Sequence, residues 1–155
     1  MIDYQFDVLE KSRRQVLKLT EDLTEEEINQ IPKGFNNNIA WNVIHLLVTQ
    51  QLLCYKLSEK AGYVDQVTID NYRRGTAPDP ARQVSLKEFE KFKEELMLNA
   101  SRIKADYPEF TKFNSLTTSI GISINSIDDA IAFNNYHEGW HIGYIIALRR
   151  AIRAL

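Results

Sequence analysis

The sequence predicts an all-α protein, a four-helix bundle whose long helices are joined by long connections. Four segments repeat apolar residues at helical spacing, capping side chains precede most of them, and glycine and proline gather mainly in between. Long amphipathic helices bury their apolar faces against one another, and a bundle is the simplest arrangement that does so. At 155 residues the chain has the size of one domain, which we expect to span residues 1–155.

The first predicted helix runs from Asp3 to about Asp22. Its apolar residues recur at helical spacing: Phe6, Leu9, Val16 and Leu17. Ser12 and Arg13 interrupt this stripe with polar side chains, and the periodicity gives no reason for the gap.

A short helical turn and a second long helix follow. Thr24 and Glu27 have the spacing of a capping box, and Pro32 discourages the turn from continuing. The asparagines at 36–38 suit a turn and an N-cap. Residues 39–60 then run without glycine or proline, which predicts one long helix.

The next segment, residues 61–84, is predicted to be a connection with little regular structure, because it contains two glycines and two prolines. Ser85 and Glu88 have capping spacing and open a third long helix over residues 85–106. Its apolar stripe consists of Leu86, Phe89, Phe92, Leu96 and Ile103.

After Pro108 we expect a second long crossover, with Gly121 in a turn and β-branched residues that suit a short extended segment. The last helix begins at Ser126, whose spacing to Asp129 suits a cap. Basic residues near its end complement the helix dipole: Arg149, Arg150 and Arg153.

Composition and charge exclude several classes of function. Lysine and arginine number 19 and aspartate and glutamate 21, so the net charge of −2 lacks the basic excess that nucleic acids require. No apolar run approaches the roughly 20 residues of a membrane span, and the amino end lacks the layout of a signal peptide. Cys54 is the one cysteine, so no internal disulfide forms. We expect a soluble, cytoplasmic protein that binds neither nucleic acid nor membrane.

The three histidines are the candidate metal ligands. His137 and His141 stand four apart in the segment HEGWH, so they lie roughly 40° apart on one face of the last helix. That face, and the face of the second long helix that carries His45, are mainly apolar, so all three imidazoles should point into the bundle. Buried imidazoles need partners, and a divalent cation would accept a lone pair from each. The alternative is a set of core histidines that binds no metal.

The segment HEGWH also matches the HExxH pattern of zinc peptidases, in which the glutamate is the general base. Those enzymes normally take a third ligand from downstream of the helix. Residues 142–155 contain no histidine, aspartate or glutamate, so a peptidase of this type is disfavoured.

Three segments, IPKGFNNNIAWNVIHLL, YRRGTAP and NNYHEGWHIGYIIALRRAI, are together similar to the DinB/YfiT-like superfamily of bacterial four-helix-bundle proteins. The resemblance covers nearly the whole chain. It implies one divalent metal ion, usually zinc or nickel, bound by His45, His137 and His141. The family pattern commonly continues as His-Arg-Gly-Gln after the last ligand, whereas the letters here are HIGY.

The resemblance implies metal-dependent chemistry on a small molecule. Characterised relatives include thiol-dependent transferases and isomerases that use low-molecular-weight thiols, and others are described as metal-dependent hydrolases. Three neutral histidine ligands leave a coordination position open for a water or thiol nucleophile. We expect Glu138 to be the general base or proton relay, with a solvated residue on the helix flank as the alternative. Tyr144 is expected either to orient a substrate or to pack.

Two other functions stay open on the sequence. The missing arginine and glutamine favour a non-catalytic metal-binding or ligand-binding bundle, and histidines that bind nothing would leave an interaction module. The expected partners are a small-molecule substrate, a low-molecular-weight thiol, and a second copy of the chain in a homodimer whose interface the sequence does not locate.

The remaining reactive and aromatic residues receive structural roles. Cys54 lies about 180° around its helix from His45, so it should face away from the metal and be a small buried hydrophobe or an interface residue. Arg73 and Arg74 are expected to be solvated, with anion binding as the alternative. Trp41 and Trp140 are each near a candidate ligand histidine. Both are expected to pack in the core, with a further role for one of them as a wall of the pocket as the alternative.

Overall fold

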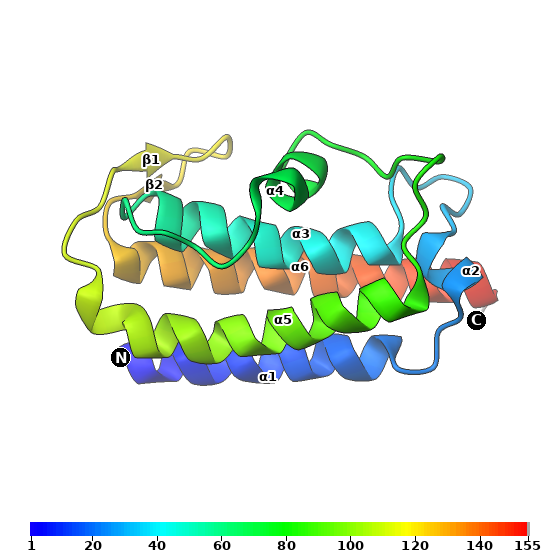
Figure 1. Cartoon of the computed structure of the whole chain (residues 1–155), viewed down its shortest axis with the longest axis horizontal. Helices are drawn as coiled ribbons and strands as arrows, with labels where there is room; N and C mark the ends of the chain where they lie inside the picture. The colour runs from blue at the N-terminus through cyan, green and yellow to red at the C-terminus, as the bar shows by residue number, and fades with distance from the viewer. Residues whose placement is uncertain (155) are drawn as a thin grey trace.

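Four long helices packed side by side form the body of the protein, which confirms the predicted bundle (Figure 1). The computed structural model describes residues 1–154. The long helices are α1 (Ile2–Thr20), α3 (Ile39–Gln50), α5 (Leu86–Asp106) and α6 (Ile127–Arg153). Two short helices, α2 (Glu25–Asn29) and α4 (Gln66–Tyr72), lie in the connections. Helices α1 and α3 each contact both α5 and α6, so the four long helices enclose a common core.

Polar side chains fix where the helices begin, as the capping spacings predict. Thr24 and Glu27 form a reciprocal capping box at α2. At four other helices, the N-cap side chain accepts a hydrogen bond from the backbone N–H three residues later: Asn38 for α3, Asp65 for α4, Ser85 for α5 and Ser126 for α6. Each cap of this kind stabilises its helix by about 1 kcal/mol.

The second long helix changes its winding partway along. One regular helix is predicted over residues 39–60, but α3 ends at Gln50 and continues as the π-helix η1 (Gln51–Lys56). A π-helix is wound more widely than an α-helix, so it rotates the side chains that follow. Both Cys54 and Tyr55 are buried, in an apolar cluster with residues of α1, α5 and α6. The π-helix is thus the place where two successive side chains, Cys54 and Tyr55, are both buried in the core.

The two long connections hold more structure than the sequence indicates. Residues 61–84, predicted to have little regular structure, contain α4, which is too short for its periodicity to stand out. The second crossover contains the 3-10 turn η2 (Tyr107–Glu109) and an antiparallel hairpin of β1 (Leu116–Thr117) and β2 (Ser123–Ile124). Gly121 has a φ of +82° in the hairpin turn, so the turn predicted for it is confirmed.

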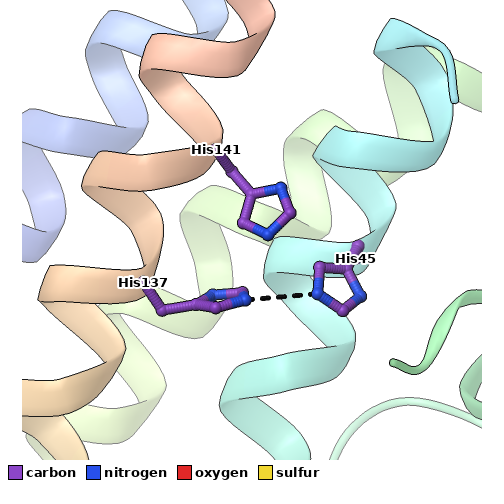
Figure 2. Close-up of side chains that lie close together, drawn as sticks. All are labelled: His45, His137 and His141. Carbon is purple, nitrogen blue, oxygen red and sulfur yellow. Dashed lines mark hydrogen bonds between the residues drawn. The ribbon is translucent and has the colours of Figure 1, made fainter. Parts of the chain in front are cut away.

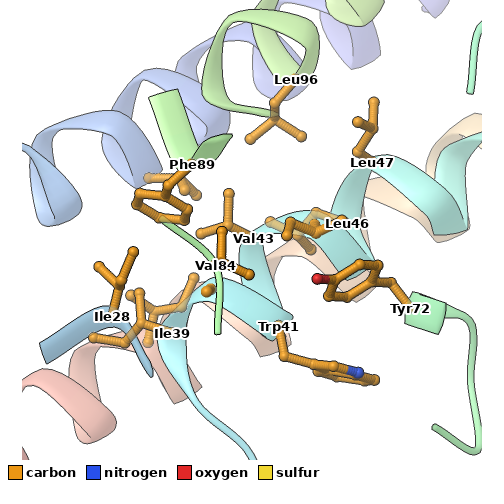
Figure 3. Packing of buried hydrophobic residues seen from close by; sticks show 14 of the residues in the cluster. Ile28, Ile39, Trp41, Val43, Leu46, Leu47, Tyr72, Val84, Phe89 and Leu96 are labelled. Atoms are coloured by element: carbon orange, nitrogen blue, oxygen red, sulfur yellow. The ribbon is translucent and has the colours of Figure 1, made fainter. Parts of the chain in front are cut away.

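Apolar side chains fill the bundle along its length. One cluster joins mainly α2, α3, α5 and the C-terminal half of α6, and a second joins α1, η1, α5 and the start of α6. Figure 3 shows part of the first cluster, with Val43 and Leu47 of α3 and Phe89 and Leu96 of α5. Among residues 1–154, no helix is both long enough and apolar enough to cross a membrane.

A buried ion pair explains the polar gap in the first helix. The side chains of Arg13 and Glu138 are fully buried, and Nη2 of the arginine lies 2.7 Å from Oε1 of the glutamate. The guanidinium also donates to the carbonyl oxygen of Leu96 at 2.6 Å and to Oε1 of Gln50 at 2.9 Å. These residues belong to α1, α6, α5 and α3, so one polar layer links all four long helices.

The basic end of α6 is tied to the connection that follows α1. Arg149 donates to Asp22 at 2.8 Å, and Arg153 donates to Glu27 at 2.7 Å. The hydrogen bond from Arg153 lowers the pKa of Glu27 to about 2. Two of the three arginines predicted to complement the helix dipole, Arg149 and Arg153, therefore also hold the end of α6 against α2 and the connection before it.

Candidate metal centre

The three histidines gather in one place between α3 and α6 (Figure 2). His45 comes from α3, whereas His137 and His141 come from successive turns of α6. Nε2 of His45 lies 3.2 Å from Nε2 of His137, and one ring nitrogen of each histidine lies within 4.8 Å of the other two. The predicted convergence of the imidazoles is confirmed, and the cluster could hold a metal ion.

A backbone carbonyl fixes the orientation of His45. Nδ1 of the ring lies 2.6 Å from the carbonyl oxygen of Tyr72, at the end of α4. A carbonyl oxygen can only accept, so Nδ1 carries the proton and the lone pair of the neutral ring is on Nε2. Trp41 stacks on the same ring, with the centroids 4.5 Å apart and the planes 13° from parallel. The Nε2 lone pair of His45 is therefore directed toward the other histidines.

The long connection supports this arrangement from behind. The indole N–H of Trp41 donates to Oγ1 of Thr76 at 3.1 Å, and the Thr76 hydroxyl donates to the carbonyl oxygen of Arg73 at 2.8 Å. The segment YRRGTAP thus contacts both His45 and the ring stacked on it. A connection that looks unstructured in the sequence positions a candidate ligand.

The side-chain amide of Asn42 fixes the orientation of His141. Nδ1 of this ring lies 2.7 Å from Oδ1 of Asn42. The Nδ2 group of Asn42 donates to the carbonyl oxygen of Asn38 at 2.7 Å and to Oδ1 of Asn37 at 2.8 Å, so the Asn42 oxygen is left to accept. His141 therefore also carries its proton on Nδ1 and its lone pair on Nε2.

Burial keeps the three rings neutral. Burial and the neighbouring histidines lower the pKa of His137 to about 2, and burial together with His45 lowers the pKa of His141 to about 3. Burial also lowers the pKa of His45, against the opposing effect of its hydrogen bond to Tyr72. Neutral imidazole is the form that binds a metal, so none of the three rings has to lose a positive charge before it binds a metal ion at neutral pH.

These lowered pKa values predict that the metal-free protein loses stability in mild acid. Below about pH 6.5 the histidines of the unfolded chain take up protons that the folded chain does not, so falling pH favours unfolding. The free energy of unfolding should be greatest above that pH and decrease toward the folded-state pKa values near 2 and 3. Urea unfolding of chelator-treated protein between pH 7.5 and 4.5 measures this slope. The variant His137→Gln should have a shallower slope, and an unchanged slope would contradict the assignment.

The donor set fits a divalent transition metal. Zinc with nitrogen ligands at about 2.0–2.1 Å in a tetrahedral arrangement requires nitrogen atoms about 3.3 Å apart. The Nε2 atoms of His45 and His137 are separated by 3.2 Å. Imidazole suits zinc and nickel, whereas magnesium and calcium prefer oxygen ligands. The Thr49 hydroxyl also reaches Nε2 of His45, at 3.3 Å, so it borders the cluster.

In the structure, the two residues predicted to act on a substrate, Glu138 and Tyr144, contact other side chains of the protein. The carboxylate of Glu138 is held by Arg13 and by Nδ2 of Asn134, so the solvated alternative is wrong. A carboxylate that is buried and paired with an arginine does not fit the predicted general base either. Tyr144 is half-buried against the core, with its ring edge-on to Phe35 at 5.5 Å between centroids, which agrees with the packing alternative.

The two tryptophans have different environments. Trp41 is buried, as predicted, but Trp140 is 51% exposed and lies beside the exposed ring of Tyr136, with 4.7 Å between the centroids. The core position predicted for Trp140 is wrong because the residue lies about 60° around α6 from His137, on the side away from the other helices.

The remaining predicted roles agree with the structure. Cys54 is buried, and burial raises the pKa of its thiol to about 12, which suits an inert apolar residue. Arg73 and Arg74 are exposed, and Arg73 lies 3.8 Å from Asp70 in a surface ion pair.

Sequence reasoning missed the groups that orient the histidines. Asn42 and Thr49 stand three residues before and four residues after His45, so helical spacing could have identified both. The carbonyl of Tyr72 carries no such signal, because a backbone atom is independent of residue type.

Comparisons with known proteins agree with this arrangement. No curated protein gives a significant match to the sequence. The sequence matches the family model of the DinB superfamily over residues 8–145, a region that includes all three histidines. The chain therefore belongs to the DinB superfamily.

Proposed function

We propose that this protein binds one divalent metal ion, zinc or nickel, through Nε2 of His45, His137 and His141, and uses it for nucleophilic chemistry on a small molecule. The orientation of the rings carries the proposal. Tyr72 and Asn42 accept the Nδ1 protons of two of the histidines, which leaves both Nε2 lone pairs directed into the cluster. Histidines that ligate metals are characteristically held in this way by their second nitrogen.

Residues of the long connection close one face of the candidate centre. A divalent ion held by three histidines would keep a coordination position open and supply Lewis acidity, which lowers the pKa of a water or thiol toward neutral. The neutral rings add no positive charge to the centre. Trp41 and the Tyr72 carbonyl close it on the side of the long connection. The Thr49 hydroxyl can orient a polar group of the substrate.

Thiol transfer fits this site better than hydrolysis. A thiol has an ordinary pKa near 8.5, so a modest shift makes it a thiolate and no general base is required. Hydrolysis requires a much larger shift, because the metal must lower the pKa of a bound water from far above neutral, and a basic side chain would assist that step. Because Glu138 is committed to Arg13, the side chain predicted for that task is occupied. We therefore propose a low-molecular-weight thiol as the cosubstrate.

Elemental analysis of protein purified without a histidine tag tests the proposal. Wild-type chain should carry close to one zinc or nickel ion, and His45→Ala should carry almost none, because two ligands on one helix hold an ion weakly. Trp140→Ala is the matched control, since it alters an exposed neighbour of His141 that is no ligand.

Activity assays then separate the reaction types. Metal-loaded wild type should transfer low-molecular-weight thiols to electrophilic small molecules faster than the chelated protein or His45→Ala. Hydrolysis of ester or amide probes at the same metal occupancy, without thiol transfer, would overturn the choice of thiol. A wild-type chain that takes up no metal even after reconstitution would overturn the metal centre itself.

A non-catalytic metal-binding or ligand-binding bundle is the second candidate. It is favoured by Ile142 and Tyr144, which occupy the positions where the family resemblance implies arginine and glutamine. Stoichiometric metal with no turnover in either assay would support this second function.

A further inference from the structure

The outward face of α6 carries no charge over most of its length. Between Ala130 and Leu148 the one acidic or basic residue is Glu138, which is buried against Arg13. The exposed residues of this stretch, which we call the α6 outer face, are small or aromatic: Ala132, Tyr136, Gly139, Trp140, Gly143 and Ala147. Charged residues fill more than half of the exposed positions on α1 and on α5. Because a surface helix ordinarily turns charged and polar side chains to solvent, the α6 outer face needs an explanation.

Aromatic rings and bare backbone alternate along the α6 outer face. The exposed rings of Tyr136 and Trp140 lie with 4.7 Å between their centroids, and a glycine follows each of them three residues later, at Gly139 and Gly143. A Cβ atom added to either glycine would meet no atom within 4 Å. Glycine weakens the interior of a helix relative to alanine, so the fold of a single chain accounts for neither residue. Small residues do allow the backbone of a second helix to approach closely.

This pattern suits a second copy of the chain. A two-fold axis brings the same surface of both copies together, so a face that holds both rings and gaps can fit itself. With the axis between Gly139 and Gly143, the two α6 helices would run antiparallel, and Trp140 of each copy would face the glycines of the other. A membrane surface would instead favour basic residues beside the apolar ones, and residues 130–148 contain no lysine or arginine.

The charges at the two ends of α6 favour the same arrangement. Asp129 in the first turn and Arg150 near the end are both exposed, and they lie about 60° apart around the helix, on the side of the outer face. In the antiparallel pair, Arg150 of one copy would lie opposite Ala132 of the other, about 4.5 Å along the axis from Asp129. Each basic end would therefore meet an acidic end, whereas a parallel pair would bring like charges together.

From these observations we infer that the α6 outer face is the surface through which two copies of this chain pair, antiparallel, about a two-fold axis between Gly139 and Gly143. The inference gives a location to the homodimer expected from the sequence, and it does not depend on the proposed metal centre. The uncharged stretch is about 28 Å long at 1.5 Å per residue. A contact along one helix of that length is a small interface, so we expect a dimer that dissociates on dilution.

Sedimentation velocity of metal-free protein, from low to high micromolar concentration, tests whether the chain pairs. Wild type should change from monomer to dimer as the concentration rises. The fluorescence emission should move to shorter wavelength over the same range, because Trp140 is exposed in the single chain and Trp41 is already buried. A chain that stays monomeric throughout would overturn the inference.

The variant Gly143→Gln tests the face. It should weaken association roughly tenfold or more, because the added side chain would hold the two backbones apart. The melting temperature of the diluted monomer should stay equal or rise, since glutamine is a better helix former and its Cβ meets no atom. Ser101→Gln is the matched control on the exposed side of α5, and it should associate as wild type does. Equal association of Gly143→Gln and wild type would overturn the assignment of this face.

The variant Arg150→Glu tests the antiparallel direction. It would place a carboxylate near Asp129 of the second copy, so it should weaken association, and the effect should shrink at high salt. Lys91→Glu makes the same change of charge on the exposed side of α5 and should leave association close to that of wild type. Equal association of Arg150→Glu and Lys91→Glu would overturn the antiparallel arrangement.

Discussion

The variant His141→Ala is expected to lose stoichiometric metal and, with it, the part of the thermal stability that depends on metal. Two imidazoles would remain, and zinc sites in proteins ordinarily need at least three protein ligands. A ligand present at a thousand times its dissociation constant stabilises the folded state by about 4 kcal/mol. For a chain of this length that corresponds to a fall of roughly 10 °C in melting temperature. Differential scanning calorimetry with and without zinc measures the difference.

The comparison has to be made against each protein's own metal-free form, because His141→Ala also loses a hydrogen bond to Asn42. The decisive quantity is therefore the zinc-induced shift in melting temperature. Trp140→Ala, which changes the adjacent exposed side chain, should keep the full shift. Retention of one metal per chain and of the full shift by His141→Ala would remove this histidine from the ligand set.

The variant Arg13→Met is expected to destabilise the protein by about 3–5 kcal/mol, because it leaves the carboxylate of Glu138 buried without its cation. Both side chains are fully buried, so solvent cannot replace the lost partner. The same change removes donors to Gln50 and to the carbonyl of Leu96, which weakens the contact among all four long helices. Urea unfolding followed by circular dichroism measures the loss.

The neighbouring residue provides a matched control. Arg14 forms an ion pair with Glu10 on the exposed side of the same helix, with both side chains more than half exposed, so Arg14→Met should cost about 0–1 kcal/mol. The double variant Arg13→Met with Glu138→Leu should recover much of the stability, since it removes the buried charge as well as its partner. Equal losses for Arg13→Met and Arg14→Met would contradict the importance of the buried pair.

Periodicity and capping residues predicted the bundle well because both are local properties. Helices α3, α5 and α6 begin at the predicted caps, and the histidines converge because their helix faces are apolar. Spacing alone also placed His137 and His141 on one face. The sequence was therefore sufficient for the fold class and for the candidate ligands.

Features that depend on contacts between distant segments could not be predicted in the same way. Arg13 and Glu138 are 125 positions apart, so nothing near either residue shows that each is the partner of the other. Glu138 consequently looked like a solvated or catalytic residue, and Arg13 like a defect in an apolar stripe. The π-helix η1 was missed because residues 51–56 continue an uninterrupted run of helix-forming residues.

The separation of the ligands along the chain also has a consequence for the timing of metal exchange. His45 and His137 are 92 positions apart and become neighbours only when α3 and α6 have docked. The complete ligand set is therefore absent from the unfolded chain, so an ion held by all three histidines would stabilise only states in which the two helices are docked. Stabilising contacts formed after the folding barrier slow unfolding and leave the folding rate nearly unchanged. A bound ion would thus have a residence time coupled to the opening of these two helices, so its retention would be governed by kinetics as well as by affinity.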